Sequence, residues 1–287
     1  MTQDTRSAQP LSLPQAIALG LLQGPTELLP VSSSGHTSLL PWLARWPYAR
    51  ADPELRKSFE VALHTGSGLA LAIALRGELA DALRELDGRQ GGMVALSLAP
   101  PTVAGYSLER VIERRLGGPR SIAAGLVAGA VAMALADGRG SRRKASRGRG
   151  EAGPRDGLAL GLAQAAALIP GVSRSGATLA AARARGFDRA AATSLSWHAG
   201  LPVLLGASAL KGYRLARDGI PKETAALLAA GGSSAFLSTF AAARLLGRNR
   251  REGPPLLPYA LYRCVLAAFV LQRLRRDRAT NAEQIKK

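Results

Sequence analysis

Val31-Ser-Ser-Ser-Gly-His-Thr37 and Val172-Ser-Arg-Ser-Gly-Ala-Thr178 share the pattern V-S-x-S-G-x-T, and this repeated stretch decides how the chain is organised. Upstream of it, Ala18-Leu-Gly-Leu-Leu-Gln23 matches Ala159-Leu-Gly-Leu-Ala-Gln164. Duplicated apolar segments that Gly, Pro and Ser interrupt at corresponding places are typical of membrane proteins with paired broken helices. A plain loop between two Ala-rich helices would explain one copy, but it does not explain two.

The distribution of charge also indicates a membrane protein, although charged residues make up 20% of the chain and its mean hydropathy is only +0.06. A bilayer core needs about 20 apolar residues per helix, and a soluble bundle would show polar residues every three or four positions. Asp, Glu, Lys and Arg are absent from five windows of about that length: 90–108, 121–136, 157–173, 190–210 and 224–243.

The predicted fold is an all-α polytopic membrane domain with an inverted internal repeat, about six transmembrane helices and two re-entrant helical hairpins. Three spans in each half is an odd number, so the second half should lie upside down relative to the first. Irregular backbone at membrane depth must be enclosed by protein or line a cavity, so the two hairpins should meet in the interior. The first half, 1–156, holds a hairpin at 11–44, spans at about 59–75, 90–111 and 119–136, and a basic loop at 137–156. The second half, 157–287, holds a hairpin at 157–184, spans at about 190–210, 224–246 and 256–274, and a basic tail.

The net charge of +18 comes from basic connections, chiefly 139–155 and the tail after Gln272. Such segments suit anionic lipid headgroups. Neither run carries the aromatic residues or docking motif that a nucleic-acid partner would need, so we expect none. The middle of 139–155 is expected to be a solvated linker, and the run 139–155 as a whole is expected to be disordered. The single cysteine, Cys264, excludes an intrachain disulfide and a cysteine metal cluster.

Counting Lys and Arg on each side of this topology gives 19 on the side of the termini and 17 on the other, with Arg174 and Arg263 left inside. The positive-inside rule therefore assigns no orientation. The oligomeric state is equally open, a homo-oligomer included.

The two loops carry the polar groups of an active site. Glu27 and Arg174 interrupt otherwise uncharged runs, and an ionisable residue at membrane depth is a functional hypothesis by default. A structural ion pair between the hairpins is the alternative. Ser33 and Arg174 occupy the same position of the repeat, which suggests a nucleophile in one half and a phosphate-binding cation in the other. His36 is the nearest base for Ser33, and Glu27 could orient that imidazole or bind a divalent cation.

These parts suit phosphoryl transfer on a phosphorylated lipid, and no Walker A loop accompanies them. The runs Gln23-Gly-Pro-Thr-Glu-Leu-Leu-Pro-Val-Ser-Ser-Ser-Gly-His36 and Pro170-Gly-Val-Ser-Arg-Ser-Gly-Ala-Thr178 resemble the two signatures of the bacterial undecaprenyl pyrophosphate phosphatases, also called bacitracin-resistance proteins. The similarity covers about Leu13 to Leu274. It implies a multi-pass inner-membrane enzyme whose site opens to the outer face and which removes the terminal phosphate of undecaprenyl pyrophosphate. That reaction recycles the lipid carrier of peptidoglycan synthesis and gives bacitracin resistance.

The resemblance also implies roles for individual residues. It implies a divalent cation, Mg²⁺ or Ca²⁺, bound by Glu27 and Gln23. Gln23 stands where many members have glutamate, and an amide is a weaker metal ligand than a carboxylate. The implied catalytic set is Glu27, Ser33, His36 and Arg174, and the implied phosphate contacts are Ser32, Ser34, Ser173, Ser175 and Thr178.

Three further polar residues fall on the predicted spans. His64 and His198 are expected to be satisfied core histidines, and Arg263 is expected to reach the nearer membrane surface, although a second phosphate contact is an alternative. Two other functions stay open. A transporter or flippase of a phosphorylated lipid would use the same architecture but needs no nucleophile, and a scaffold would leave Glu27 and Arg174 unexplained. The identity of the attacking group, Ser33, His36 or water, also stays open.

Overall fold

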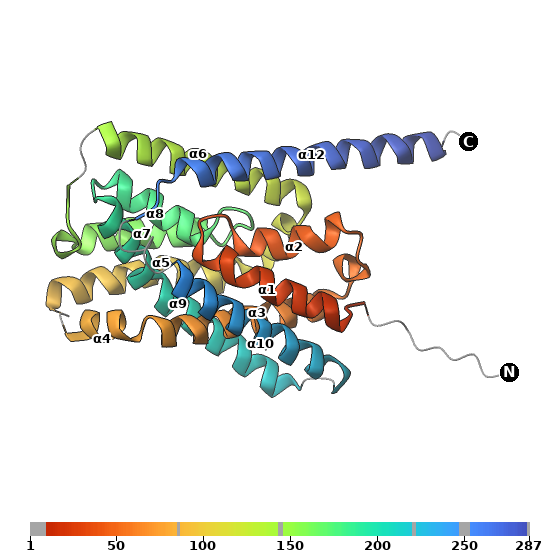
Figure 1. Cartoon of the computed structure of the whole chain (residues 1–287), viewed down its shortest axis with the longest axis horizontal. Coiled ribbons are helices and arrows are strands. Elements are labelled where there is room, and N and C mark those ends of the chain that lie inside the picture. Colours follow the sequence, from red (N-terminus) through yellow and green to blue (C-terminus); the bar gives the residue numbers. More distant parts are fainter. Residues whose placement is uncertain (1–9, 85–86, 143–145, 220–221, 247–252, 286–287) are drawn as a thin grey trace.

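A computed structural model of the chain describes residues 10–84, 87–142, 146–219, 222–246 and 253–285, and these are almost entirely helical (Figure 1). The first half contains α1 (Leu13–Leu28), α2 (Ser33–Leu43), the 3-10 turn η1 (Pro47–Arg50), α3 (Pro53–Ala74), α4 (Arg76–Arg84), α5 (Gly88–Leu116) and α6 (Pro119–Arg142). The second contains the 3-10 turn η2 (Arg149–Glu151), α7 (Pro154–Ala166), α8 (Arg174–Ala184), α9 (Arg189–Asp218), α10 (Lys222–Leu245) and α12 (Leu257–Ile285). The described ranges hold no strand, only an isolated bridge between Arg147 and Phe187.

Both copies of the repeated stretch form a break between two helices. Ser32 and Ser173 are the N-caps of α2 and α8, and each side chain accepts a hydrogen bond from the backbone three residues on. Both serines have positive φ, 79° and 70°. A non-glycine residue in such a conformation costs about 1–3 kcal/mol and persists only where its surroundings enforce it, so both breaks are strained at the same position.

The upstream match also has a structural meaning, because it places one glycine at a close helix contact in each copy. Gly20 brings α1 against α10, and a Cβ atom there would lie 2.5 Å from the Gly231 carbonyl oxygen. Gly161 brings α7 against α5, where a Cβ atom would lie 2.5 Å from the Leu96 carbonyl oxygen. The first helix of each half thus packs on a helix of the other half, as a duplicated chain would allow.

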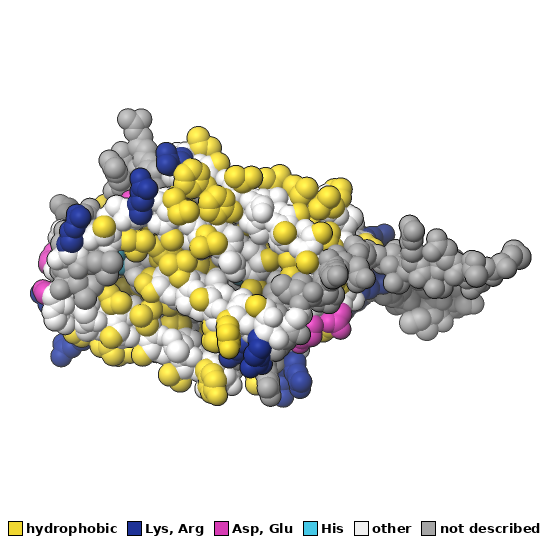
Figure 2. Space-filling model, turned by 90° about the horizontal axis from the view of Figure 1, so that it is seen from below, with side chains coloured by type: hydrophobic (Ala, Val, Ile, Leu, Met, Phe, Trp, Pro, Cys, Tyr) yellow, Lys and Arg dark blue, Asp and Glu magenta, His cyan; other side chains and the backbone are white. Residues whose placement is uncertain are grey.

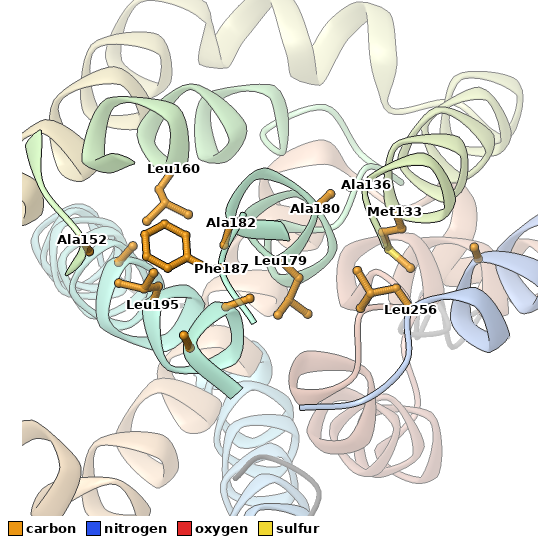
Figure 3. Packing of buried hydrophobic residues seen from close by; sticks show 14 of the residues in the cluster. Met133, Ala136, Ala152, Leu160, Leu179, Ala180, Ala182, Phe187, Leu195 and Leu256 are labelled. Atoms are coloured by element: carbon orange, nitrogen blue, oxygen red, sulfur yellow. The ribbon is translucent and has the colours of Figure 1, made fainter. Parts of the chain in front are cut away.

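Buried apolar residues fill the spaces around the two breaks. In the largest cluster Leu160, Phe187 and Leu195 lie together beside α8, whose Leu179 and Ala180 continue the cluster toward Met133 of α6 (Figure 3). A separate cluster joins α2 and α6 to α12, and α6 and α12 run side by side (Figure 1). The short helices α2 and α8 are therefore held inside the longer ones.

The outside of the bundle is apolar over large areas. Figure 2 shows hydrophobic side chains across the middle of one face, with many of the Lys and Arg side chains toward its edges. Val103, Leu237 and Val265 are 64–68% exposed. Contiguous exposed apolar surface of this kind marks a membrane or protein contact, so the helical structure agrees with a membrane protein.

Two helices are long and apolar enough to cross a membrane by length and composition alone: Pro119–Gly140, with a mean hydropathy of 1.6, and Thr224–Leu245, with 1.4. The other expected spans do not meet this criterion within the described residues. Pro100 and Pro101 with several glycines lower the hydropathy of α5, and Arg263 and Arg273 lower that of α12.

The structure corrects several expected boundaries. Helix α4 was not expected, and α9 and α12 continue beyond the predicted spans 190–210 and 256–274. The basic run 139–155 was expected to be disordered, but α6 continues to Arg142 and the residues from Ser146 onward are ordered; residues 143–145 lie outside the described ranges.

Arg147 orders this second part of the basic run. Its guanidinium donates to both Asp156 carboxylate oxygens at 3.2 and 2.9 Å and lies 4.1 Å from the centre of the Phe187 ring. Burial raises the pKa of Asp156, but hydrogen bonds from Arg147 and Arg185 outweigh it and hold that pKa below its ordinary value of 3.8.

Candidate active site

The two loops meet inside the helical bundle. Arg174 Nη2 of the second loop donates to Glu27 Oε1, at the end of α1, at 3.0 Å. Ser175 Oγ donates to the Leu29 carbonyl at 3.4 Å. The residues that the sequence placed in separate halves therefore share one site.

Glu27 is the centre of this site, because three side chains donate to its buried carboxylate. Besides Arg174, Ser33 Oγ donates to Oε2 at 2.7 Å and Gln23 Nε2 donates to the same oxygen at 3.3 Å. The carboxylate is 5% exposed. A buried charge that is paired and fully hydrogen-bonded is stable in such a place, so Glu27 is held in its charged form beside the Ser33 hydroxyl.

His36 does not contact Ser33, contrary to the expected base-to-nucleophile pair. Its Nδ1 lies 2.7 Å from the Ser32 carbonyl, which can only accept, so Nδ1 carries the proton. Its Nε2 lies 2.7 Å from the Tyr262 hydroxyl, and the two rings stack with centroids 5.7 Å apart. Tyr262 is a site residue that the sequence analysis missed, because it lies on a remote helix without any motif.

The first turns of α2 and α8 supply donors that have no partner. Helix geometry leaves the backbone N–H groups of Ser33, Ser34, Arg174 and Ser175 without an intrahelical acceptor, and no other acceptor reaches them in the described part of the chain. Two helix N-termini that face one site favour an anion, and phosphate is the usual ligand of such sites.

Arg174 has one donor to spare. Its Nη1 atom is buried and has no hydrogen-bond partner among the described residues. The guanidinium lies 5.9 Å from the centre of the Trp197 ring, and any Cβ atom on Gly200 would collide with Nη1. The lack of a side chain at Gly200 of α9 thus makes room for this guanidinium.

The hydroxyl-bearing residues expected to bind phosphate have different surroundings. Ser32 and Ser173 cap their own helices through Oγ. The Ser34 side chain makes no hydrogen bond within the described residues and is free for a ligand. Thr178 is fully buried, and its hydroxyl contacts the Arg174 carbonyl at 2.9 Å and Ser196 Oγ at 2.6 Å. The geometry therefore gives Thr178 a role between α8 and α9 instead of at the anion.

The two histidines on the predicted spans differ from each other. His64 borders the site, because its Nδ1 accepts from Gln23 Nε2 at 3.3 Å and lies 3.9 Å from Glu27 Oε2. His198 lies apart from the site, where Nδ1 bonds the Ser194 carbonyl at 2.6 Å. Neither is a fully buried core histidine.

Arg263 corrects another expectation. It does not extend to a membrane surface, because it is fully buried and donates to backbone carbonyls of both loops. Its Nη atoms contact the protein backbone, so they are not free to bind phosphate.

The metal-ligating groups of the site are few. The described residues contain no group of three His, Cys, Asp or Glu side chains that could hold a metal ion. The first loop and the end of α1 offer one carboxylate, Glu27, and the Gln23 amide, which lies 3.3 Å from it. Mg²⁺ is commonly held by one or two carboxylates together with substrate phosphates, so this set fits a cation that arrives with the substrate.

Comparison with known proteins gives the family. Residues 16–269 match the family described as "Bacitracin resistance protein BacA". The chain is 40% identical to the undecaprenyl-diphosphatase of Geobacter sulfurreducens over 278 residues, which cover 92% of this chain and 99% of the relative. It is 38% identical to that of Thermomicrobium roseum, covering 90% and 96%, and 37% identical to that of Chromohalobacter salexigens, covering 89% and 96%. The chain therefore belongs to the bacitracin resistance protein family.

Proposed function

We propose that the chain is an undecaprenyl-diphosphatase that hydrolyses undecaprenyl pyrophosphate to undecaprenyl phosphate and inorganic phosphate. Membership of the family and the names of the near full-length relatives support this substrate. The observation that carries the chemistry is the 2.7 Å hydrogen bond from Ser33 to Glu27 beside Arg174 and two free helix N-termini. The reaction recycles the lipid carrier for peptidoglycan synthesis and accounts for the bacitracin-resistance name.

The terminal phosphate binds between the N-termini of α2 and α8. The N–H groups of Ser33 and Ser34 donate from one side, and those of Arg174 and Ser175 donate from the other. Arg174 Nη1, which is buried without a partner, donates to the same phosphate. Phosphoryl transfer depends chiefly on positioning and charge neutralisation, and these donors supply both.

Ser33 is the proposed nucleophile, and Glu27 is its general base. The Ser33 oxygen forms a bond to the terminal phosphorus, its proton passes to Glu27 Oε2, and the bond between phosphorus and the bridging oxygen breaks. Undecaprenyl phosphate leaves with that oxygen. Glu27 releases this proton to solvent and is ionised again. A water molecule then gives its proton to Glu27 and attacks the phosphoserine, the bond between phosphorus and Ser33 Oγ breaks, and Glu27 returns the proton to Ser33 Oγ as inorganic phosphate leaves. His36 supports the first loop through the Ser32 carbonyl, and Tyr262 borders the leaving group.

A divalent cation is part of the proposal. Glu27 and the Gln23 amide would hold it together with the phosphate oxygens, and when bound it neutralises charge on the pyrophosphate. Glu27 already balances Arg174, and Gln23 offers a neutral ligand, so the cation depends on the substrate for most of its ligands.

The substrate is a membrane lipid, and the setting of the site agrees with it. A small pocket adjoins the loops and is lined largely by apolar residues, among them Leu28, Leu179 and Trp197. We place the chain in the inner membrane as an inverted repeat of six spans and two re-entrant hairpins, with the site open to the outer face. The packing of α1 on α10 and of α7 on α5, each between the two halves, supports the repeat.

A transporter is less well supported, because transport needs no serine paired with a carboxylate.

The test is phosphate release from undecaprenyl pyrophosphate by the detergent-purified chain, with and without EDTA. Ser33→Ala and Arg174→Ala should abolish release, whereas Ser38→Ala, an exposed serine on the same helix, should not change it. Release that is retained in Ser33→Ala would assign the attack to water. No release by folded wild-type protein with any divalent cation would refute the phosphatase.

A further inference from the structure

Arg263 is the largest of the fully buried side chains among the described residues and lies in the second turn of α12, outside both repeated loops. Its Nη2 donates to the carbonyls of Gly171 and Val172 at 2.7 and 2.8 Å, and its Nη1 donates to the Pro30 carbonyl at 3.3 Å. Nη2 also reaches the Gly125 carbonyl of α6 at 3.3 Å. One side chain therefore joins the first loop, the second loop and α6.

No carboxylate pairs with Arg263 anywhere in the described ranges. A buried cation without an anion is costly, and replacing such a group with an apolar one is often neutral or stabilising for a fold. General stability of the bundle therefore does not explain an arginine here. An arginine at this position is explained if its hydrogen bonds fix the two loops relative to each other.

The surrounding helices make space for the guanidinium at two glycines. A Cβ atom on Gly129 of α6 would collide with Nη2 and would lie 2.6 Å from the Val172 carbonyl oxygen that Nη2 binds, and one on Gly176 of α8 would lie 2.9 Å from Nη1. Small residues on two separate helices thus shape one cavity to this side chain. Gly138 lies on α6 like Gly129, but a Cβ atom there would meet open space. A substitution at Gly138 is therefore a matched control for one at Gly129.

Two of the carbonyls that Arg263 binds lie within two residues of the strained serines. Val172 is followed by Ser173, and Pro30 lies two residues before Ser32, and both serines have positive φ. In a trans peptide the carbonyl and the following N–H point in opposite directions. Holding the Val172 carbonyl on the α12 side therefore turns the Ser173 N–H to the other side, and a strained conformation of this kind persists because its neighbours enforce it.

We infer that Arg263 is the positioning residue of the phosphate site, which sets the two strained loops at one separation without touching the substrate. This inference rests on the proposed function for its kinetic consequences. The contacts exclude a direct phosphate role for the Nη atoms, because these donate to backbone carbonyls and to the Met133 sulfur.

Four variants test it kinetically. Arg263→Met removes the charge and keeps much of the volume. Gly129→Ala keeps the arginine but adds a methyl group where Nη2 lies, and Gly138→Ala is its control. A displacement of a catalytic group by about 1 Å can lower the rate about 100-fold.

We expect kcat to fall about 100-fold in Arg263→Met and about 10-fold or more in Gly129→Ala, with thermal midpoints near that of the wild type. Arg263→Lys, which reaches fewer carbonyls, should be intermediate, and Gly138→Ala should match the wild type. Wild-type kcat in folded Arg263→Met, or activity that falls only with the folded fraction, would overturn the inference.

A structural measurement separates this inference from the proposed function. Leu29→Cys and Ser175→Cys, in a Cys264→Ser background that removes the single native thiol, place two thiols where the loops touch. The rate of oxidative cross-linking should be high with Arg263 and should drop at least about 10-fold with Arg263→Met. An equal rate in both backgrounds refutes the positioning role whether or not the chain hydrolyses pyrophosphate. A lower rate in a chain that proves inactive refutes the phosphatase alone.

Discussion

Ser33 Oγ and Glu27 Oε2 lie 2.7 Å apart, while the other oxygen of the same carboxylate accepts from Arg174. One buried acid thus joins a hydroxyl of the first loop to a cation of the second. This relationship changes the division of roles expected from the sequence, because the base nearest Ser33 in space is a carboxylate six residues before it and not the histidine three residues after it.

Replacing Glu27 with Gln tests this pairing. The amide keeps the shape of the side chain but cannot take the Ser33 proton, so kcat should fall about 10²- to 10⁴-fold, the usual contribution of a general base. Glu60→Gln is the matched control, since Glu60 is 48% exposed on α3. Phosphate release from undecaprenyl pyrophosphate measures both. Equal loss in the two variants would argue for a general electrostatic effect.

Gly200→Ala should impair the site through Arg174. The added Cβ would occupy the position of Nη1, so the guanidinium must leave the position from which it is proposed to donate to the phosphate. We expect kcat/KM to fall about 10- to 100-fold with little change in the far-ultraviolet circular dichroism. Gly206→Ala on the same helix meets open space and should behave as the wild type. Similar kinetics for the two variants would contradict the crowding argument.

Tyr262→Phe removes the hydroxyl that lies 2.7 Å from His36 Nε2 but keeps the stacked ring. If the histidine acts by supporting the first loop, kcat should fall less than about 10-fold. His36→Ala should cost more, because it also removes the contact to the Ser32 carbonyl. A loss in Tyr262→Phe as large as that in His36→Ala would instead make the hydroxyl a direct participant in the reaction. Steady-state kinetics of the two variants decide between these outcomes.

The Asp156 cluster should make stability depend on pH. Its folded pKa lies below the ordinary 3.8, so its ion pairs stabilise the folded chain above pH 3.8, and this stabilisation is lost as pH falls through the folded value. Asp156→Asn should therefore lower the thermal midpoint at pH 7, and its difference from the wild type should shrink below pH 3.8. Thermal unfolding in detergent at a series of pH values measures this. A difference that does not change with pH would mean that packing, and not charge, is lost.

The sequence predicted the parts of the site that a repeat can reveal. Ser33 and Arg174 could be aligned because the motif is duplicated, and Glu27 stood out because charge is rare in its segment. Tyr262 could not be found, since an isolated tyrosine on a half-exposed helix carries no local signal. Arg263 was visible as a charge, but its direction depends on glycines of α6 and α8 that only packing brings together. Helix ends were missed at α9 and α12, where the helix continues past the apolar residues into a stretch rich in charged ones.

Ser33 and Arg174 hold the same place, the first residue of α2 and of α8. A site built from two identical copies would bind a pyrophosphate group equally well in either direction, because the two phosphates at its ends are similar. The hydroxyl of Ser33 on one side and the guanidinium of Arg174 on the other make the two sides of the site different. In the proposed mechanism the terminal phosphate must lie on the Ser33 side for the lipid to leave with a single phosphate, so the difference between Ser33 and Arg174 would set which side of the anhydride is cut.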